Sequence, residues 1–224
     1  ALAAPLQAQS PARNTAAASA ARVDAQWMDA EGVSVPVPPR EHPRLFLRQR
    51  DIQDLRRRTT HPRLKPVWDR LQQAGKSDRQ LGLEADAVRY LLSGDKALAR
   101  RTAAAGLKLL QEAQFDLKAQ DVSRPMGRLM VTGAIVYDWC YDGLNAAQKE
   151  AFVQEFLRLA RLLECGYPPR QSGFVTGHYS EWMLMRDMMS AGIAIYDEFP
   201  EMYRLAANRF FKGFVPVRNW WYAG

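Results

Sequence analysis

Residues 124–141 read RPMGRLMVTGAIVYDWCY. Apolar side chains occur on nearly every side of a helix built from these residues, rather than along one stripe. That distribution is typical of a helix surrounded by other helices. The stretch therefore predicts a buried helix at the centre of the fold.

The segments on both sides of this stretch also have helical periodicity. None has the strict alternation of a half-buried strand, so a doubly wound sheet is excluded, and no glycine-rich nucleotide motif is present. Short loops between helices predict antiparallel neighbours, and hence an all-α stack of helical hairpins. The expected helices cover residues 51–59, 62–74, 79–92, 96–113, 124–141, 146–165, 177–196 and 201–214.

The charge balance is basic. The chain has 31 Lys and Arg against 24 Asp and Glu, a net charge of +7, and 24 of the basic residues are arginine. Guanidinium groups bind carboxylate and sulfate in pairs of hydrogen bonds, so an acidic polymer is a natural partner, although the charge can equally serve to solvate helix faces. The arginines are scattered, which disfavours nucleic acid. No apolar run is long enough to span a membrane.

The first 43 residues differ from the rest in composition. Residues 1–25 are rich in alanine and are expected to be disordered, compatible with the remnant of a signal peptide and with a periplasmic or secreted protein. Residues 26–43 are expected to form an extended proline-rich segment. Two cysteines, Cys140 and Cys165, exclude a disulfide-dense scaffold. They are expected to remain separate thiols, although an oxidising compartment would allow them to pair.

Four short motifs together resemble the heparinase II/III-like polysaccharide lyases. Arranged in chain order, they are His42-Pro-Arg-Leu-Phe-Leu47, Gly133-Ala-Ile-Val-Tyr-Asp-Trp-Cys-Tyr-Asp142, Gly177-His-Tyr-Ser-Glu181 and Asn219-Trp-Trp-Tyr-Ala-Gly224. The resemblance spans about residues 41–224. It implies that residues 44–224 form the N-terminal part of an incomplete (α/α) toroid, truncated here, with the family's β-sandwich domains absent.

The resemblance assigns chemistry to His178 and Glu181. A lyase removes the C5 proton of a uronic acid and expels the C4 oxygen, so a group must neutralise the sugar carboxylate and stabilise the developing enolate. The family's His-x-x-Glu pair meets that carboxylate, and these two residues match it. Three residues apart at a helix start, they share one face. Without the family, a helix cap or a surface ion pair would explain them better.

Substrate binding is expected from Arg124, Arg128 and Tyr179. Arg124 opens the buried helix, at a distance before His178 that resembles a substrate-contacting arginine of the family. Arg128 lies one turn further on, and a plain salt bridge explains it equally well or better. Aromatic faces stack on sugar rings, so Tyr179, Trp182 and residues 220–222 are candidate platforms, although core packing explains Trp182 better. His42 and His61 are expected to have no chemical role.

The resemblance thus implies β-elimination at a uronic acid of an acidic polysaccharide, heparan sulfate, heparin or a related glycosaminoglycan, with no cofactor and no metal. Neither the family's proton-transfer tyrosine nor its second histidine has a matching position here, so we expect this chain alone to be inactive. The alternatives are an alginate lyase of the same class, a glycoside hydrolase using Asp138, Asp142 or Glu181, and a non-enzymatic helical module that binds acidic glycans. The sequence does not fix the oligomeric state.

Overall fold

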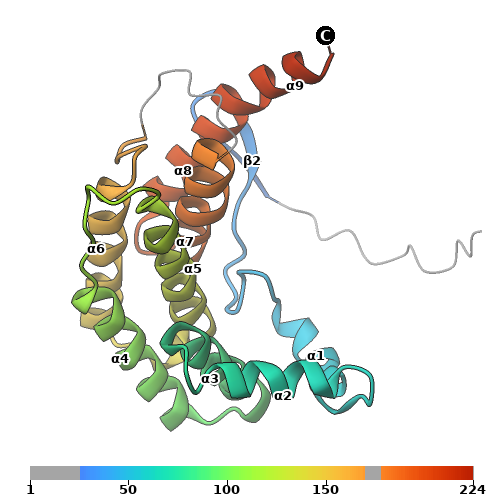
Figure 1. Ribbon diagram of the computed structural model, residues 1–224. Coiled ribbons are helices and arrows are strands. Elements are labelled where there is room, and N and C mark those ends of the chain that lie inside the picture. Colours follow the sequence, from blue (N-terminus) through green and yellow to red (C-terminus); the bar gives the residue numbers. More distant parts are fainter. Residues whose placement is uncertain (1–25, 170–177, 224) are drawn as a thin grey trace, which may run out of the picture.

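The computed structural model describes residues 26–169 and 178–223, except that the side chains of residues 178–181 lie outside the description. The fold is mostly helical, as predicted, with one two-stranded sheet in the described ranges (Figure 1). Several consecutive helices are neighbours in space: α3 packs on α4, α4 on α5, α5 on α6 and α7 on α8. None of the helices in these ranges combines the length and the apolar character that a membrane span needs.

The sheet is the first departure from the sequence argument, which expected no strands. Strands β1 (Trp27–Asp29) and β2 (Ser34–Pro36) pair antiparallel within the segment expected to be extended. Three residues are too few for a recognisable alternation of side chains. The hairpin is fastened to helix α8, because the Tyr203 hydroxyl donates to the Pro36 carbonyl and the Asn208 amide donates to the Ala30 carbonyl.

Helices α1 (Ile52–Thr60) and α2 (Lys65–Ala74) follow a short 3-10 turn, η2 (Gln49–Asp51), and form an arm that projects from the bundle (Figure 1). The predicted helix 62–74 begins three residues late, at Lys65. Its apolar stripe is not a core face, since no residue of α2 is buried and the side chains of Leu64 and Val67 are exposed. The helical spacing was right, but spacing alone does not say whether a neighbour covers the stripe.

Helices α3 (Arg79–Ser93) and α4 (Lys96–Glu112) begin and end where local chemistry dictates. The Asp78 and Asp95 carboxylates each accept two backbone N–H groups of the first turn that follows. Such caps satisfy donors that have no partner inside the helix. Gly94 ends α3 with a φ of 74°, a conformation that glycine adopts without steric cost. The Ser93-Gly94-Asp95 stop signal is therefore confirmed.

Helix α5 (Ser123–Trp139) is the buried centre that the opening stretch predicts. It packs against α3, α4, α6 and the later helices η4 and α7, and its buried residues lie on all sides. After the turn η3 (Tyr141–Gly143), Asn145 caps α6 (Ala146–Leu162) through a reciprocal pair of bonds with Gln148. Helix α6 ends at Leu162, before the glycine expected to end it.

The C-terminal helices differ from the prediction in their winding. The segment expected as one α-helix over 177–196 consists of a π-helix, η4 (His178–Met188), and a short α7 (Met189–Ala194). Helix α8 (Pro200–Asn208) continues through a second π-helical stretch, η5 (Arg209–Phe214), into α9 (Val215–Ala223). The side chains of Trp220, Trp221 and Tyr222 on α9 are exposed.

The cysteines lie where the helices predict. Cys140 and Cys165 are both buried. Burial raises the pKa of Cys140 to about 12. A thiol with so high a pKa is almost never ionised at neutral pH, so Cys140 serves as a small core residue.

Gly127 leaves room on α5 for the side chains of Asp187 and Arg186 from η4. A Cβ atom at this position would lie 1.9 Å from Oδ2 of Asp187 and 2.9 Å from Nη2 of Arg186. Since real atoms never approach so closely, any larger residue would push the two helices apart.

We expect Gly127→Ala to lower the free energy of unfolding by about 1–3 kcal/mol, the usual cost of overpacking a tight core. Chemical denaturation measures the change. The control is Gly213→Ala, where a Cβ meets nothing within 4 Å and alanine favours helix, so stability should hold or rise. Equal stability of both variants would contradict the close packing of α5 and η4.

Candidate functional site

The predicted site residues divide into two groups. The side chains of His178, Tyr179 and Glu181 lie outside the described residues, although the backbone of all three belongs to η4. Arg124 and Arg128 lie in the first turns of α5, which packs against η4. The structure therefore brings the two predicted segments together, but the geometry can be followed only from Arg124, Arg128 and the residues after Glu181.

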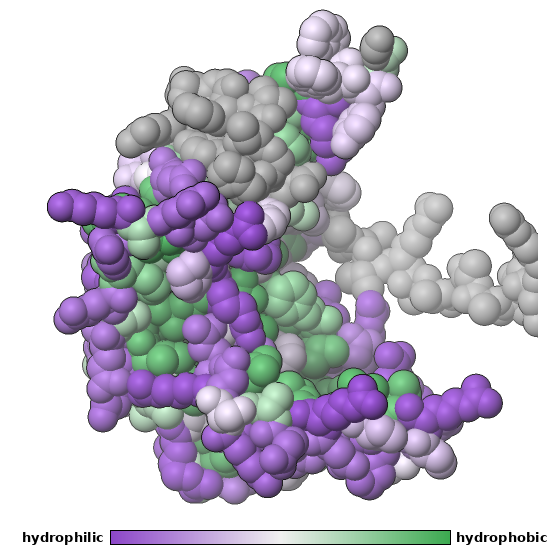
Figure 2. Space-filling view, in the orientation of Figure 1, coloured by the Kyte–Doolittle hydropathy of each residue, from purple (hydrophilic) through white to green (hydrophobic). Residues whose placement is uncertain are grey.

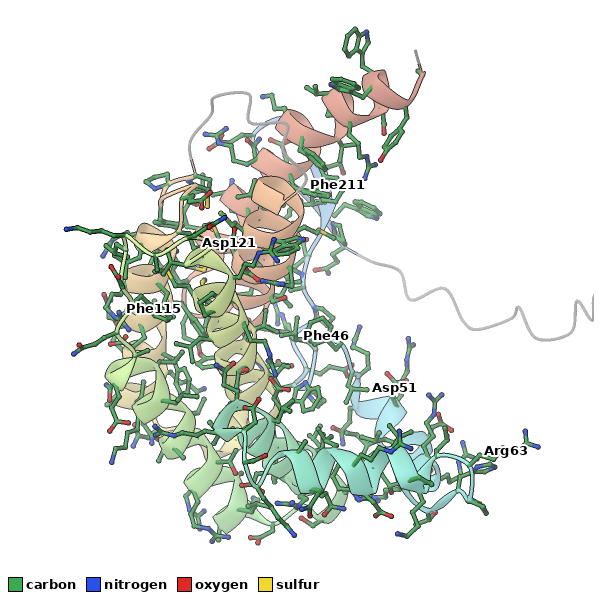
Figure 3. All side chains as sticks on the ribbon, in the orientation of Figure 1. Phe46, Asp51, Arg63, Phe115, Asp121 and Phe211 are labelled. Atoms are coloured by element: carbon green, nitrogen blue, oxygen red, sulfur yellow. The ribbon has the colours of Figure 1, made fainter. Side chains whose placement is uncertain are left out.

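Arg124 lies against the ring of Trp182, the residue that follows Glu181. Its guanidinium carbon is 4.2 Å from the centre of the indole, and its Nε atom is 3.8 Å from the carboxylate of Asp121. The Arg124 side chain remains about half exposed. Together with Asp121, Ser123, Glu164 and Met183, both residues line a small depression at the N-terminal end of α5, the end marked by Asp121 in Figure 3.

A second guanidinium shares this indole. Arg186, one helical turn after Trp182, lies 5.4 Å from the ring centre, and its Nε donates to the carboxylate of the next residue, Asp187. We name the four residues Arg124, Trp182, Arg186 and Asp187 the arginine–tryptophan cluster. Arg186 is thus paired with a buried carboxylate, whereas the half-exposed Arg124 guanidinium is the member of the cluster that can meet an anion from solvent.

Asp187 is the member of this cluster that sequence reasoning missed. Its side chain is fully buried, and its Oδ2 atom has no hydrogen-bond partner among the described residues. Burial raises the pKa of Asp187 to about 6, against the lowering effect of the hydrogen bond from Arg186. The only available signal was an adjacent Arg-Asp pair within a methionine-rich helix, which surface residues also produce.

Arg128 is engaged in a bridge between helices. It forms an ion pair with Glu84 of α3 and donates to Oγ1 of Thr132, which itself donates to the same carboxylate. The interaction with Glu84 raises the pKa of Arg128. One turn of α5 thus separates an arginine facing the indole from an arginine that joins two helices.

A second polar centre forms at the opposite end of α5, around Asp138. Its Oδ1 atom lies 2.6 Å from Nδ1 of His42, whose ring stacks on Tyr141 at 3.6 Å. Its Oδ2 atom accepts the backbone N–H groups of Arg44 and Leu45, both at 2.8 Å. Asp138 is fully buried, so these bonds replace the water it has lost.

The Arg44 guanidinium connects this centre to the C-terminal helices. It donates to Asp197 at 3.1 Å and to the Ala194 carbonyl at the end of α7 at 2.8 Å. We call this set of residues, His42, Arg44, Leu45, Asp138 and Asp197, the Asp138 latch. It joins the segment before α1, the end of α5 and the end of α7. His42, expected to have no chemical role, therefore has a structural one.

A pocket of about 190 Å³ adjoins the latch, between the His42-Pro43 segment, α1, the end of α3 and η3. Both oxygens of Asp138 are already bonded, which makes this carboxylate a poor hydrolase acid. Burial raises the pKa of Tyr90 and Tyr141 at this pocket, and Asp142 and Glu198 add to the rise. These two phenols stay protonated at neutral pH, so neither is a ready base in this pocket.

No protein-family model matches this chain, and no curated protein is significantly similar to it. Within residues 26–169 and the described part that begins at residue 178, no three His, Cys, Asp or Glu side chains are placed to hold a metal ion. The case for a function therefore rests on the arginine–tryptophan cluster and on the residues beside it.

We expect Asp138→Asn to destabilise the fold by about 2–4 kcal/mol, because it removes a buried charge paired with His42 and sets an amide donor against backbone donors. Urea denaturation measures the loss. Asp69→Asn is the control, since Asp69 forms an exposed ion pair with Lys65 on α2. If both variants lose equally little, the latch does not hold the fold.

The raised pKa of Asp187 sets the sign of a pH effect. The folded carboxyl keeps its proton up to about pH 6, whereas the unfolded one loses it near pH 4. The folded state then binds more protons between these values, so stability falls as pH rises from about 4 to about 6. Asp187→Asn should reduce this fall by about 1–3 kcal/mol in denaturation curves across that window. An unchanged slope would contradict the assignment.

Proposed function

We propose that this protein is a polysaccharide lyase of the heparinase II/III-like kind, acting by β-elimination at a uronic acid of an acidic polysaccharide. One observation carries the proposal. Arg124, at the start of α5, lies 4.2 Å from the ring of Trp182, beside the segment of η4 whose sequence includes His178 and Glu181. Residues 54 or more positions apart are thus brought to one place by the packing of two helices.

The chemistry suits an anionic sugar. A guanidinium forms paired hydrogen bonds with a carboxylate or a sulfate, and the Trp182 ring beside it offers an apolar face. In the proposal, Arg124 holds the substrate's acidic group, while His178 and Glu181 meet the uronate carboxylate. Neutralising that carboxylate lowers the barrier to removing the C5 proton, since the transition state carries more negative charge than the ground state.

The packing of consecutive helices supports the proposed (α/α) toroid. Alternate helices also pack on one another, α3 on α5, α5 on α7 and α4 on α6, as the inner and outer helices of an incomplete toroid would. The alanine-rich residues 1–25 support the proposal of a periplasmic or secreted protein, where such polymers are found.

The pKa values of the tyrosines limit which group can accept the C5 proton. Burial raises the pKa values of Tyr90, Tyr137, Tyr141, Tyr167 and Tyr203. None of these five is a good base at neutral pH, so the proposal gives proton transfer to a group outside this set. The same observation favours a second candidate, a helical module that binds acidic glycans without cleaving them.

Binding to a heparan sulfate oligosaccharide, measured by titration calorimetry, tests the proposal. Arg124→Ala should weaken binding by about 10- to 100-fold, because a charged hydrogen bond contributes about 1.5–3 kcal/mol. Arg63→Ala is the matched control, since this exposed arginine lies between α1 and α2, away from α5 (Figure 3). Equal affinities for the two variants would contradict the proposed site.

An assay for product formation distinguishes a lyase from a module that only binds the glycan. A lyase releases an unsaturated uronate that absorbs in the near ultraviolet. We would follow this absorbance with the chain itself and with a longer protein that continues beyond Gly224. Absorbance that grows with the longer protein and is lost on His178→Ala supports the lyase. Tight binding with no product from either protein supports the module.

A further inference from the structure

Phe46 combines two features that proteins usually avoid. Its side chain is 64% exposed, although it is one of the largest apolar groups. Its φ angle is 64°, in the left-handed region that bulky residues rarely adopt. The other non-glycine residues with positive φ in the described ranges, Glu31 and Asp121, have polar side chains.

The backbone around Phe46 is a tight γ-turn. The Leu47 N–H donates to the Leu45 carbonyl at 2.8 Å, which closes a three-residue turn with Phe46 at its centre. A γ-turn with a left-handed central residue is rare and strained. Here the strain exists at a residue whose side chain gains little from packing within the protein.

The Asp138 latch holds this turn in place from both sides. Asp138 accepts the N–H groups of Arg44 and Leu45, and the Leu45 carbonyl also accepts the indole N–H of Trp139 at 2.9 Å. A strained residue persists only where its surroundings fix it, and such residues concentrate at ligand-binding positions. The latch therefore fixes the ring of Phe46 in an exposed position.

The surroundings point to an acidic occupant. Phe46 lies on the side from which α1 and α2 project (Figure 3), and this side is hollowed between the bundle and the arm (Figure 2). Helix α1, which begins six residues later, carries three arginines and one aspartate, so its charge is positive. A rigid aromatic face on a chain of net charge +7 suits the ring of an anionic sugar.

We propose that Phe46 is a sugar-stacking platform for the acidic polysaccharide of the proposed function, on which this inference rests. The latch lies at the C-terminal end of α5 and Arg124 at its N-terminal end. Fourteen residues separate Arg124 from Asp138, or about 21 Å along the helix axis. Phe46 is therefore a distal subsite, reached by a long polysaccharide chain and not by a short oligosaccharide bound at Arg124.

The test compares a long heparan sulfate chain with a short heparin oligosaccharide on the full chain. Phe46→Ala should weaken binding of the long chain roughly fivefold, the size of one lost aromatic contact, and leave the short one unchanged. Phe46→Tyr should retain binding of both. Phe211→Ala, which removes another exposed phenylalanine, on η5, should change neither.

Phe46→Gly separates binding from folding. Glycine adopts a positive φ readily, so this variant should keep its melting temperature while losing affinity for the long chain as Phe46→Ala does. Unchanged affinity of Phe46→Ala and Phe46→Gly for the long chain, with Arg124→Ala still weakened, would overturn the platform and leave the proposed function standing. Equal loss on the short oligosaccharide would overturn the distal position. Failure of the unmodified chain to bind either probe would overturn both proposals.

Discussion

The carboxylate of Asp138 is the interaction on which the described fold depends. It is fully buried, yet it is bonded to two backbone N–H groups and to a histidine from a segment more than 90 residues earlier in the chain. A buried charge is tolerated only with such compensation, because losing water costs several kcal/mol. Through Arg44 the same centre reaches the end of α7. One acid therefore fixes how the N-terminal segment, the central helix and the C-terminal helices meet.

Two of the four motifs that carry the family resemblance meet at this acid. His42, Arg44 and Leu45 come from the first motif, and Asp138 and Tyr141 come from the second. Their contacts explain why these residue types occur together, because the contacts hold the segment before α1 against the end of α5. A likeness in these motifs thus concerns the framework, whereas the proposed chemistry depends on the third motif and on Arg124 at the opposite end of α5.

Local rules allowed much of the fold to be predicted. The cap residues Asp78, Asp95 and Asn145 and the left-handed Gly94 mark helix ends through bonds to nearby backbone, so sequence alone reveals them. Contacts between distant residues were not predictable. His42 precedes a proline in a loop, and nothing nearby signals a partner at Asp138. Asp187 was hidden likewise, because its burial depends on the missing side chain of Gly127. The packing of α5 against η4 brings Arg124 beside Trp182, a contact between distant residues that the sequence does not reveal.

The exposed α2 has a consequence for motion. None of its residues is buried, and it packs on α1 and α3 at the margin of the molecule. Segments with little buried apolar surface open locally at a small fraction of the free energy that global unfolding requires. Amide hydrogens of α2 should therefore exchange with solvent much faster than those of α5, while the latch stays closed. Helix α2 is then a separately fluctuating unit at the margin of the molecule, able to move without loss of the core.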